Sequence, residues 1–170
     1  MLIKKLHNVD YFNDIVKECQ ELLFKVPLKG NINQLSLQSK DPNIEDLYGS
    51  TGTVYKNGSQ EIFEEEYCYI NPSLKGSAIE KWIHSLGNVF RTRLMIVPPR
   101  TCYSLHNDST ARIHLPIITS PDNFMCFPSE NVMQHFPANG DSFWVDTTKY
   151  HTFMNCSLAK RIHLVAAVTL

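Results

Sequence analysis

Two histidines and one aspartate could together hold a metal ion. His106 and Asp108 form an H-x-D pair after the run TCYSL, and His151 begins a later β-rich run. In an extended segment residues i and i+2 face the same side, so His106 and Asp108 can reach one ion. Two histidines and one carboxylate suit Fe(II) with open coordination positions, and the same set accepts Zn(II) or Mn(II). The alternative is that His106 ends a strand and Asp108 starts a turn.

Arg161 adds a second indication, because it follows His151 by one expected strand. Ile162 and Leu164 flank it on the opposite strand face. An interior arginine is costly unless it meets an anion, and its planar fork suits a carboxylate. That anion is either a protein carboxylate such as Asp146 or a small dicarboxylate bound beside the metal. If the anion is the bound dicarboxylate, the site is catalytic.

Short β-rich runs from residue 93 onward must position these groups. With turns at roughly 8–12-residue spacing they predict an all-β sandwich or barrel, and a jelly roll fits a ligand-holding interior. The runs are RLMIV, TCYSL, ARIHLPII, NFMCF, VMQHF, SFWVD, HTFMN and RIHLVAAV. RIHL occurs twice without a repeat around it. In both copies Arg and His should face inward, and Ile and Leu outward into the sheet packing.

The N-terminal half has a different pattern. Apolar spacing predicts helices over 9–26, with Asp10 as N-cap, and over 73–86, with Gly87 as its stop. A weak strand is expected within 31–38, loop over 39–60, and a short strand at 53–55 before the Lys56-Asn57-Gly58 turn. We therefore expect one domain over 1–170: a helical and loop layer over 1–90, on the substrate side, and a catalytic core over 91–170.

Composition excludes several classes of protein. The 170 residues carry a formal net charge of −1, which gives no reason to expect nucleic acid as a partner. No apolar run is long enough for a membrane helix, and the opening MLIKKLHNVDYF does not resemble a signal peptide. The five cysteines form no C-x-x-C pair. That pattern favours a reducing, cytoplasmic location over a disulfide framework.

The second half resembles the Fe(II)- and 2-oxoglutarate-dependent aspartyl/asparaginyl β-hydroxylases, most closely their short, single-domain bacterial and phage-type members. The resemblance implies a mainly β fold, a double-stranded β-helix of the jelly-roll, cupin-like kind. One departure is Asp108, where the best-known vertebrate members have glycine. The matching segments, in order, are R-x-R-L-M at 91–95, H-N-D at 106–108, R-I-H-L-P-I at 112–117, H-F-P-A-N-G-D-S-F-W-V-D-T at 135–147, H-T-F-M-N at 151–155 and R-I-H-L-V at 161–165.

The resemblance also implies roles for individual residues. The iron ligands would be His106, Asp108 and His151, with O2 as the second co-substrate. Arg161 would bind the distal carboxylate of 2-oxoglutarate. The resemblance further implies secondary contacts to 2-oxoglutarate from Arg112 and His114. Tyr103 and Ser104 are expected to hydrogen-bond 2-oxoglutarate for a different reason, because they immediately precede the end of the metal-binding strand.

The expected reaction is hydroxylation of an Asp-, Asn- or Pro-type residue in a protein or peptide, with release of succinate and CO2. One alternative substrate is a free amino acid such as proline, or another small molecule. An alternative of another class is a non-catalytic metal-binding jelly roll, for which an unpaired interior Arg161 would have no use.

Other polar and aromatic residues receive weaker assignments. His163 is either a core histidine or functional, and Asn155 is expected to be structural. His135 is expected at the surface and Trp144 in the core. The run 64–66 (EEE) is expected to be a solvated face, the alternative being a landing patch for a basic substrate segment.

Overall fold

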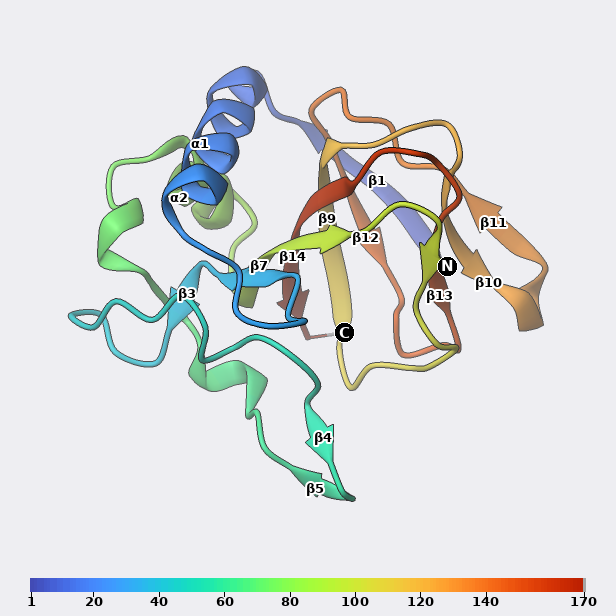
Figure 1. The fold of residues 1–170 in the computed structure, drawn as a ribbon, viewed down its shortest axis with the longest axis horizontal. Helices are drawn as coiled ribbons and strands as arrows, with labels where there is room; N and C mark the ends of the chain where they lie inside the picture. Colours follow the sequence, from blue (N-terminus) through green and yellow to red (C-terminus); the bar gives the residue numbers. More distant parts are fainter. Residues whose placement is uncertain (170) are drawn as a thin grey trace.

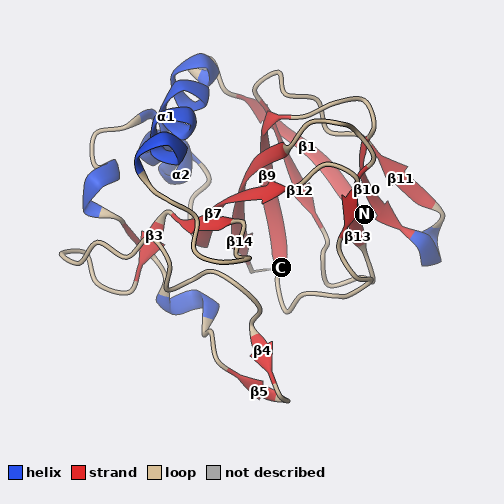
Figure 2. Cartoon of the chain, in the orientation of Figure 1, coloured by secondary structure: helices blue, strands red, loops and turns tan. Residues whose placement is uncertain are grey.

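A computed structural model describes residues 1–169, and most of its regular elements are strands (Figures 1 and 2). The two α-helices are α1 (Phe12–Lys25) and α2 (Ala78–Ser85). Short 3-10 helices cover Glu64–Glu66, Pro72–Leu74 and Pro128–Glu130. The strands are β1 (Ile3–Asn8), β2 (Gln34–Ser36), β3 (Gln38–Ser39), β4 (Tyr55–Lys56), β5 (Ser59–Gln60), β6 (Tyr69–Ile70), β7 (Phe90–Val97), β8 (Thr101–Cys102), β9 (Ala111–Ile118), β10 (Asn123–Phe127), β11 (Val132–Gln134), β12 (Asp141–Val145), β13 (Thr152–Asn155) and β14 (Arg161–Val168).

Two antiparallel sheets form the body of the protein. The six-stranded sheet has the order β1-β12-β9-β14-β7-β2, and the four-stranded sheet has the order β11-β10-β13-β8. From β7 to β14 the chain passes repeatedly from one sheet to the other, which is the connectivity of a jelly roll. The prediction of a mainly β, jelly-roll fold is confirmed at this level.

Alternation along the long strands divides the core into two parts. Outward residues such as Ile113 and Leu164 pack with apolar residues of α1 and α2, including the fully buried Trp82. The helices therefore cover the outer face of the six-stranded sheet, at the upper left of Figure 1. A second cluster, which includes Phe136 and Phe153, lies between the two sheets. Polar inward positions thus share an interior with aromatic side chains.

The N-terminal half contributes strands to the large sheet. β1 pairs with β12 and β2 pairs with β7, so both edges of the six-stranded sheet come from this half. β1 is absent from the sequence prediction because it is a mostly exposed edge strand without clean alternation. The hairpin of β4 and β5 projects from the body at the bottom of Figure 1. Its turn uses Asn57 and Gly58, both with positive φ.

The helices are shorter than the sequence pattern predicts. α1 begins at Phe12 without a side-chain cap, so Asp10 is not its N-cap. α2 begins after Ser77, whose hydroxyl accepts a hydrogen bond from the Glu80 amide at 3.0 Å. Gly76, at φ 81°, separates α2 from the 3-10 turn that precedes it. Within residues 1–169 no helix is both long and apolar enough to cross a membrane.

Candidate metal centre and its pocket

The structure brings His106, Asp108 and His151 together at one end of the jelly roll. One potential ligand atom from each lies within 4.8 Å of the other two. The backbone fixes this arrangement. His106 and His151 exchange N–H···O bonds of 3.0 and 2.8 Å, and the Asp108 amide donates to the Thr147 carbonyl at 2.8 Å. The three residues therefore converge through backbone pairing as well as through side-chain preference.

Backbone carbonyls orient both imidazoles for metal binding. His106 Nδ1 lies 2.7 Å from the Ser104 carbonyl, and His151 Nδ1 lies 2.9 Å from the Lys149 carbonyl. A carbonyl can only accept, so each Nδ1 carries the proton and each Nε2 keeps a lone pair. Burial lowers the pKa of His151, which keeps this ring neutral as metal ligation requires. Two imidazoles and one carboxylate fit Fe(II) with positions left for other ligands.

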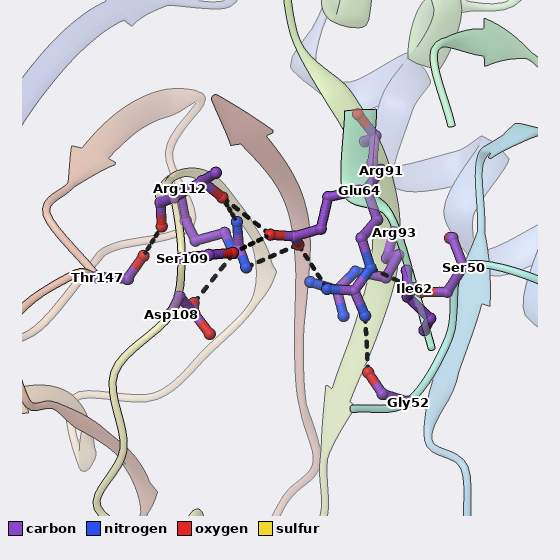
Figure 3. A network of polar contacts seen from close by, with 12 residues as sticks. Ser50, Gly52, Ile62, Glu64, Arg91, Arg93, Asp108, Ser109, Arg112 and Thr147 are labelled. Atoms are coloured by element: carbon purple, nitrogen blue, oxygen red, sulfur yellow. Dashed lines mark hydrogen bonds and ion pairs between the residues drawn. The ribbon is translucent and has the colours of Figure 1, made fainter. Parts of the chain in front are cut away.

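Arg112 forms an ion pair with Asp108, the carboxylate of the candidate metal site. Its Nε lies 3.1 Å from Asp108 Oδ2, while Asp108 Oδ1 lies on the His106 side, 3.9 Å from that imidazole Nε2. The far side of Arg112 donates from Nη2 to Glu64 Oε1 at 2.9 Å. Figure 3 shows Glu64 between Arg112 and Arg91. A chain of charges thus runs from Arg91 through Glu64 and Arg112 to the carboxylate of the metal site.

Glu64 contradicts the expectation of a solvated acidic run. Glu65 and Glu66 are exposed, but Glu64 is only 1% exposed and its Oε1 also accepts from Arg91 Nη1 at 2.6 Å. Burial alone would raise the pKa of Glu64, yet the charges of Arg112 and Arg91 outweigh it and bring this pKa to about 2. The sequence offered one signal: an interior with several arginines needs a buried carboxylate.

Arg161 lies in the same interior but has no carboxylate partner among the described residues. Its side chain is buried, its Nη2 contacts His163 Nδ1, and its guanidinium lies over the Phe153 ring at 3.4 Å from the centroid. Its Nε has no hydrogen-bond partner within residues 1–169. Asp146, the protein carboxylate considered above, accepts from Thr148 instead. Burial lowers the pKa of Arg161 to about 9, so the guanidinium remains cationic at neutral pH.

His114 and His163 lie beside Arg161 in this interior. Their Nδ1 atoms are 3.5 Å apart, and neither Nε2 has a hydrogen-bond partner in the part of the chain that the structure describes. Because Arg161 can only donate, His163 Nδ1 accepts and His163 Nε2 carries the proton. Burial lowers the pKa of both histidines well below its usual value, so both rings are neutral. Both RIHL copies therefore place Arg and His inward, as the alternation predicted.

A cavity of about 450 Å³ joins Arg161 and His114 to the His106–Asp108–His151 group. Every predicted site residue lines it, including Tyr103 and Ser104, and the N-terminal half adds Gln34 and the segment 52–55. Ser104 is already engaged through its carbonyl by His106. The direct contacts to 2-oxoglutarate assigned to Tyr103, Ser104, Arg112 and His114 stay predictions.

The residues with weaker assignments have structural contacts. Asn155 Nδ2 donates to three backbone carbonyls at 2.9–3.0 Å and closes the connection from β13 to β14. His135 is half-buried, and its Nδ1 lies 3.0 Å from the Asn123 carbonyl. Trp144 is partly buried against the helix-side core. The cavity does not include these three side chains.

Comparison with known proteins identifies the fold. The sequence matches no protein-family model and no curated protein sequence. Among solved structures, a Pseudomonas putida prolyl-4-hydroxylase superimposes with a TM-score of 0.57 at 12% identity, covering 97% of this chain and 90% of that one. The chain shares its fold.

Two further structures agree with this result. IDO from Bacillus thuringiensis gives a TM-score of 0.56 at 12% identity, covering 97% of this chain and 89% of that one. The viral collagen prolyl hydroxylase of Paramecium bursaria Chlorella virus-1 was solved as a 2-oxoglutarate complex. It gives a TM-score of 0.50 at 13% identity, covering 99% of this chain and 97% of that one. At these identities the likeness shows the fold alone. Membership of the aspartyl/asparaginyl branch stays a prediction.

Proposed function

We propose that this chain is an Fe(II)- and 2-oxoglutarate-dependent dioxygenase that hydroxylates an Asp-, Asn- or Pro-type residue in a protein or peptide. One observation carries the proposal: a buried Arg161, which has no carboxylate partner within residues 1–169, shares a cavity with the His106–Asp108–His151 ligand set. A non-catalytic metal site has no use for such a cation. A co-substrate that binds the metal at one end and carries a carboxylate at the other would fill the open metal positions and pair with Arg161.

Each group of the pocket then has a definite task. His106, Asp108 and His151 hold the iron, and Arg161 binds the distal carboxylate of 2-oxoglutarate. Bound iron and 2-oxoglutarate supply an oxidant from O2, with succinate and CO2 as by-products. Asp108 would supply a carboxylate ligand to this iron, and a protein carboxylate in that position favours hydroxylation over halogenation.

The chain's own contribution is orientation and exclusion of water. His163 holds the Arg161 guanidinium from one side and Phe153 covers its face. Met125 and Val165 add apolar surface to the cavity wall. An ion pair formed in such a site is stronger than the same pair in water. Arg161 therefore selects a co-substrate with a carboxylate at a fixed distance from the metal.

The size of the cavity favours a second candidate substrate, a free amino acid. Both 2-oxoglutarate and the reacting part of the substrate must share about 450 Å³, and the segment Thr53–Tyr55 forms part of the wall. A small molecule fits this space completely, whereas a peptide would insert one side chain and leave its backbone outside.

Turnover of the co-substrate tests the proposed function. The protein supplied with Fe(II), ascorbate, O2 and 2-oxoglutarate should release succinate, measured by NMR, and His106→Ala should not. Candidate substrates should raise the rate and gain the mass of one oxygen atom. Succinate at the same rate from His106→Ala as from the unchanged protein would exclude the proposal.

A further inference from the structure

Arg93 is a second buried arginine that pairs with no carboxylate in the described part of the chain, and no role above uses it. It lies on β7, is 5% exposed and lines the cavity. Its Nη1 donates to Gln34 Oε1 at 3.0 Å, and its Nε has no hydrogen-bond partner among the described residues. A buried guanidinium held only by a neutral amide is strongly disfavoured unless an anion joins it.

The neighbouring arginines do not share this feature. Arg91 and Arg112 both form ion pairs with Glu64, and Arg112 forms a second one with Asp108. Both carboxylates of the group are thereby used, while Arg93 lies beside them without an ion pair among residues 1–169 (Figure 3). Three guanidiniums face two carboxylates, so this side of the cavity carries excess positive charge.

Gln34 is fixed with its oxygen towards Arg93. Its Oε1 also accepts from the Gly52 amide at 3.1 Å, which ties β2 to the loop before β4. The Gln34 amide therefore fixes one edge of the guanidinium. The unpartnered Nε belongs to a cation that is already oriented, as a site for a carboxylate requires.

Arg93 and Arg161 lie in different rows of the sheet. In the ladder between β7 and β14, Arg93 pairs with Val165 and Arg161 pairs with Val97. Four residue positions separate the two pairs, which is ~13 Å of strand. His114 lies opposite Val165 on β9, in the same row as Arg93. If Arg161 binds 2-oxoglutarate, Arg93 is left for another anion.

We propose that Arg93, oriented by Gln34, binds a carboxylate of the substrate that is hydroxylated. This inference rests on the proposed function and narrows its substrate class to molecules with a carboxylate near the reacting carbon. The carboxylate comes either from the main chain of a free amino acid or from an acidic side chain in a peptide. The segment Thr53–Tyr55 borders the cavity and would contact the rest of either molecule.

Binding to the loaded protein tests this inference. The protein with Fe(II) and saturating 2-oxoglutarate under argon is titrated calorimetrically with free amino acids, N-acetyl-aspartate amide, N-acetyl-glutamate amide and the neutral N-acetyl-asparagine amide. At least one carboxylate probe should bind, and the neutral probe should not. Binding of free amino acids alone identifies the main-chain carboxylate, and binding of a capped acidic residue identifies the side chain. Failure of every carboxylate probe overturns the inference.

Two substitutions connect the binding to Arg93. Arg93→Gln should weaken the best probe by roughly 30-fold or more, as expected for loss of one partner of a buried charge pair, and Arg93→Lys should restore part of it. Gln34→Glu gives Arg93 an internal carboxylate. It should weaken the probe while raising the melting temperature, which excludes misfolding as the cause. Unchanged probe affinity in Arg93→Gln and Gln34→Glu contradicts the inference.

The affinity for 2-oxoglutarate distinguishes failure of this inference from failure of the proposed function. Arg93→Gln should leave 2-oxoglutarate affinity within about threefold, whereas Arg161→Gln should lower it strongly. Equal loss in both variants would place 2-oxoglutarate on Arg93 and overturn the inference. If the unchanged protein does not bind 2-oxoglutarate with Fe(II), the proposed function itself fails.

Discussion

Arg112 Nε lies 3.1 Å from Asp108 Oδ2, so a residue expected to contact 2-oxoglutarate holds a metal ligand in place. The same guanidinium donates to Glu64 and contacts Thr110. These contacts leave Asp108 Oδ1 for the metal and fix the rotation of the carboxylate. Outer contacts of this kind commonly set metal affinity.

Replacing Arg112 should therefore weaken metal binding. We expect Arg112→Gln to lower the affinity for Mn(II) about 10- to 100-fold, because Asp108 loses the group that orients it. The measurement is an electron paramagnetic resonance titration of free Mn(II). Arg100→Gln, at an exposed arginine, should keep the affinity of the unchanged protein. Equal affinities for both variants would show that Arg112 does not orient the ligand.

Replacing Glu64 should destabilise the whole fold. Glu64→Gln leaves Arg91 and Arg112 buried without their shared anion, a change that costs about 3 kcal/mol. Urea unfolding followed by circular dichroism measures this loss. Glu65→Gln, one residue on and exposed, should change the free energy of unfolding by less than about 0.5 kcal/mol. If Glu64→Gln lowered the free energy of unfolding by less than about 1 kcal/mol, the ion pairs of Glu64 with Arg91 and Arg112 would not be buried as described.

Stability should fall with acid in two steps. Burial lowers the pKa values of His114 and His163 below the usual 6.5, so the unfolded chain binds more protons and stability declines as the pH drops below about 6.5. Glu64, with its pKa lowered from 4.5 to about 2, adds a second decline below pH 4.5. Each proton taken up on unfolding lowers the free energy of unfolding by up to about 1.4 kcal/mol for every unit by which the pH falls.

Free energies of unfolding at pH 7, 6, 5 and 4 test the first step. His163→Leu should make the decline between pH 6.5 and 5 shallower, because this site no longer takes up a proton on unfolding. His7→Leu, at an exposed histidine, serves as the control and should keep the original slope. A His163→Leu profile parallel to that of the unchanged protein would show that His163 is protonated in the folded state.

The interior of the site was predictable because strand alternation decides it. The period of two places both Arg and His of each RIHL copy on one face, and the H-x-D pair needs only an extended backbone. Glu64 was not predictable, because it reaches the interior from a 3-10 turn between two loops, where no periodicity applies. Arg93 lies in a strand that the pattern did predict. Its need for an anion becomes visible only once Glu64 is seen to pair with Arg91 and Arg112.

The edges of the fold were less predictable for a related reason. β1 pairs with β12 along one side only, so its sequence carries little apolar alternation. β2 has three residues, and its position follows from pairing with the long strand β7. Such elements depend on contacts distant in sequence. Local patterns indicate them weakly.

The most direct measurement of the central claim is the visible absorption of the anaerobic protein with Fe(II) and 2-oxoglutarate. Chelation of 2-oxoglutarate by iron should produce a metal-to-ligand charge-transfer band. Arg161→Ala should require a much higher 2-oxoglutarate concentration for the same band, while Lys160→Ala, at the exposed neighbour, should not. No band from the unchanged protein at saturating Fe(II) and 2-oxoglutarate would contradict the account.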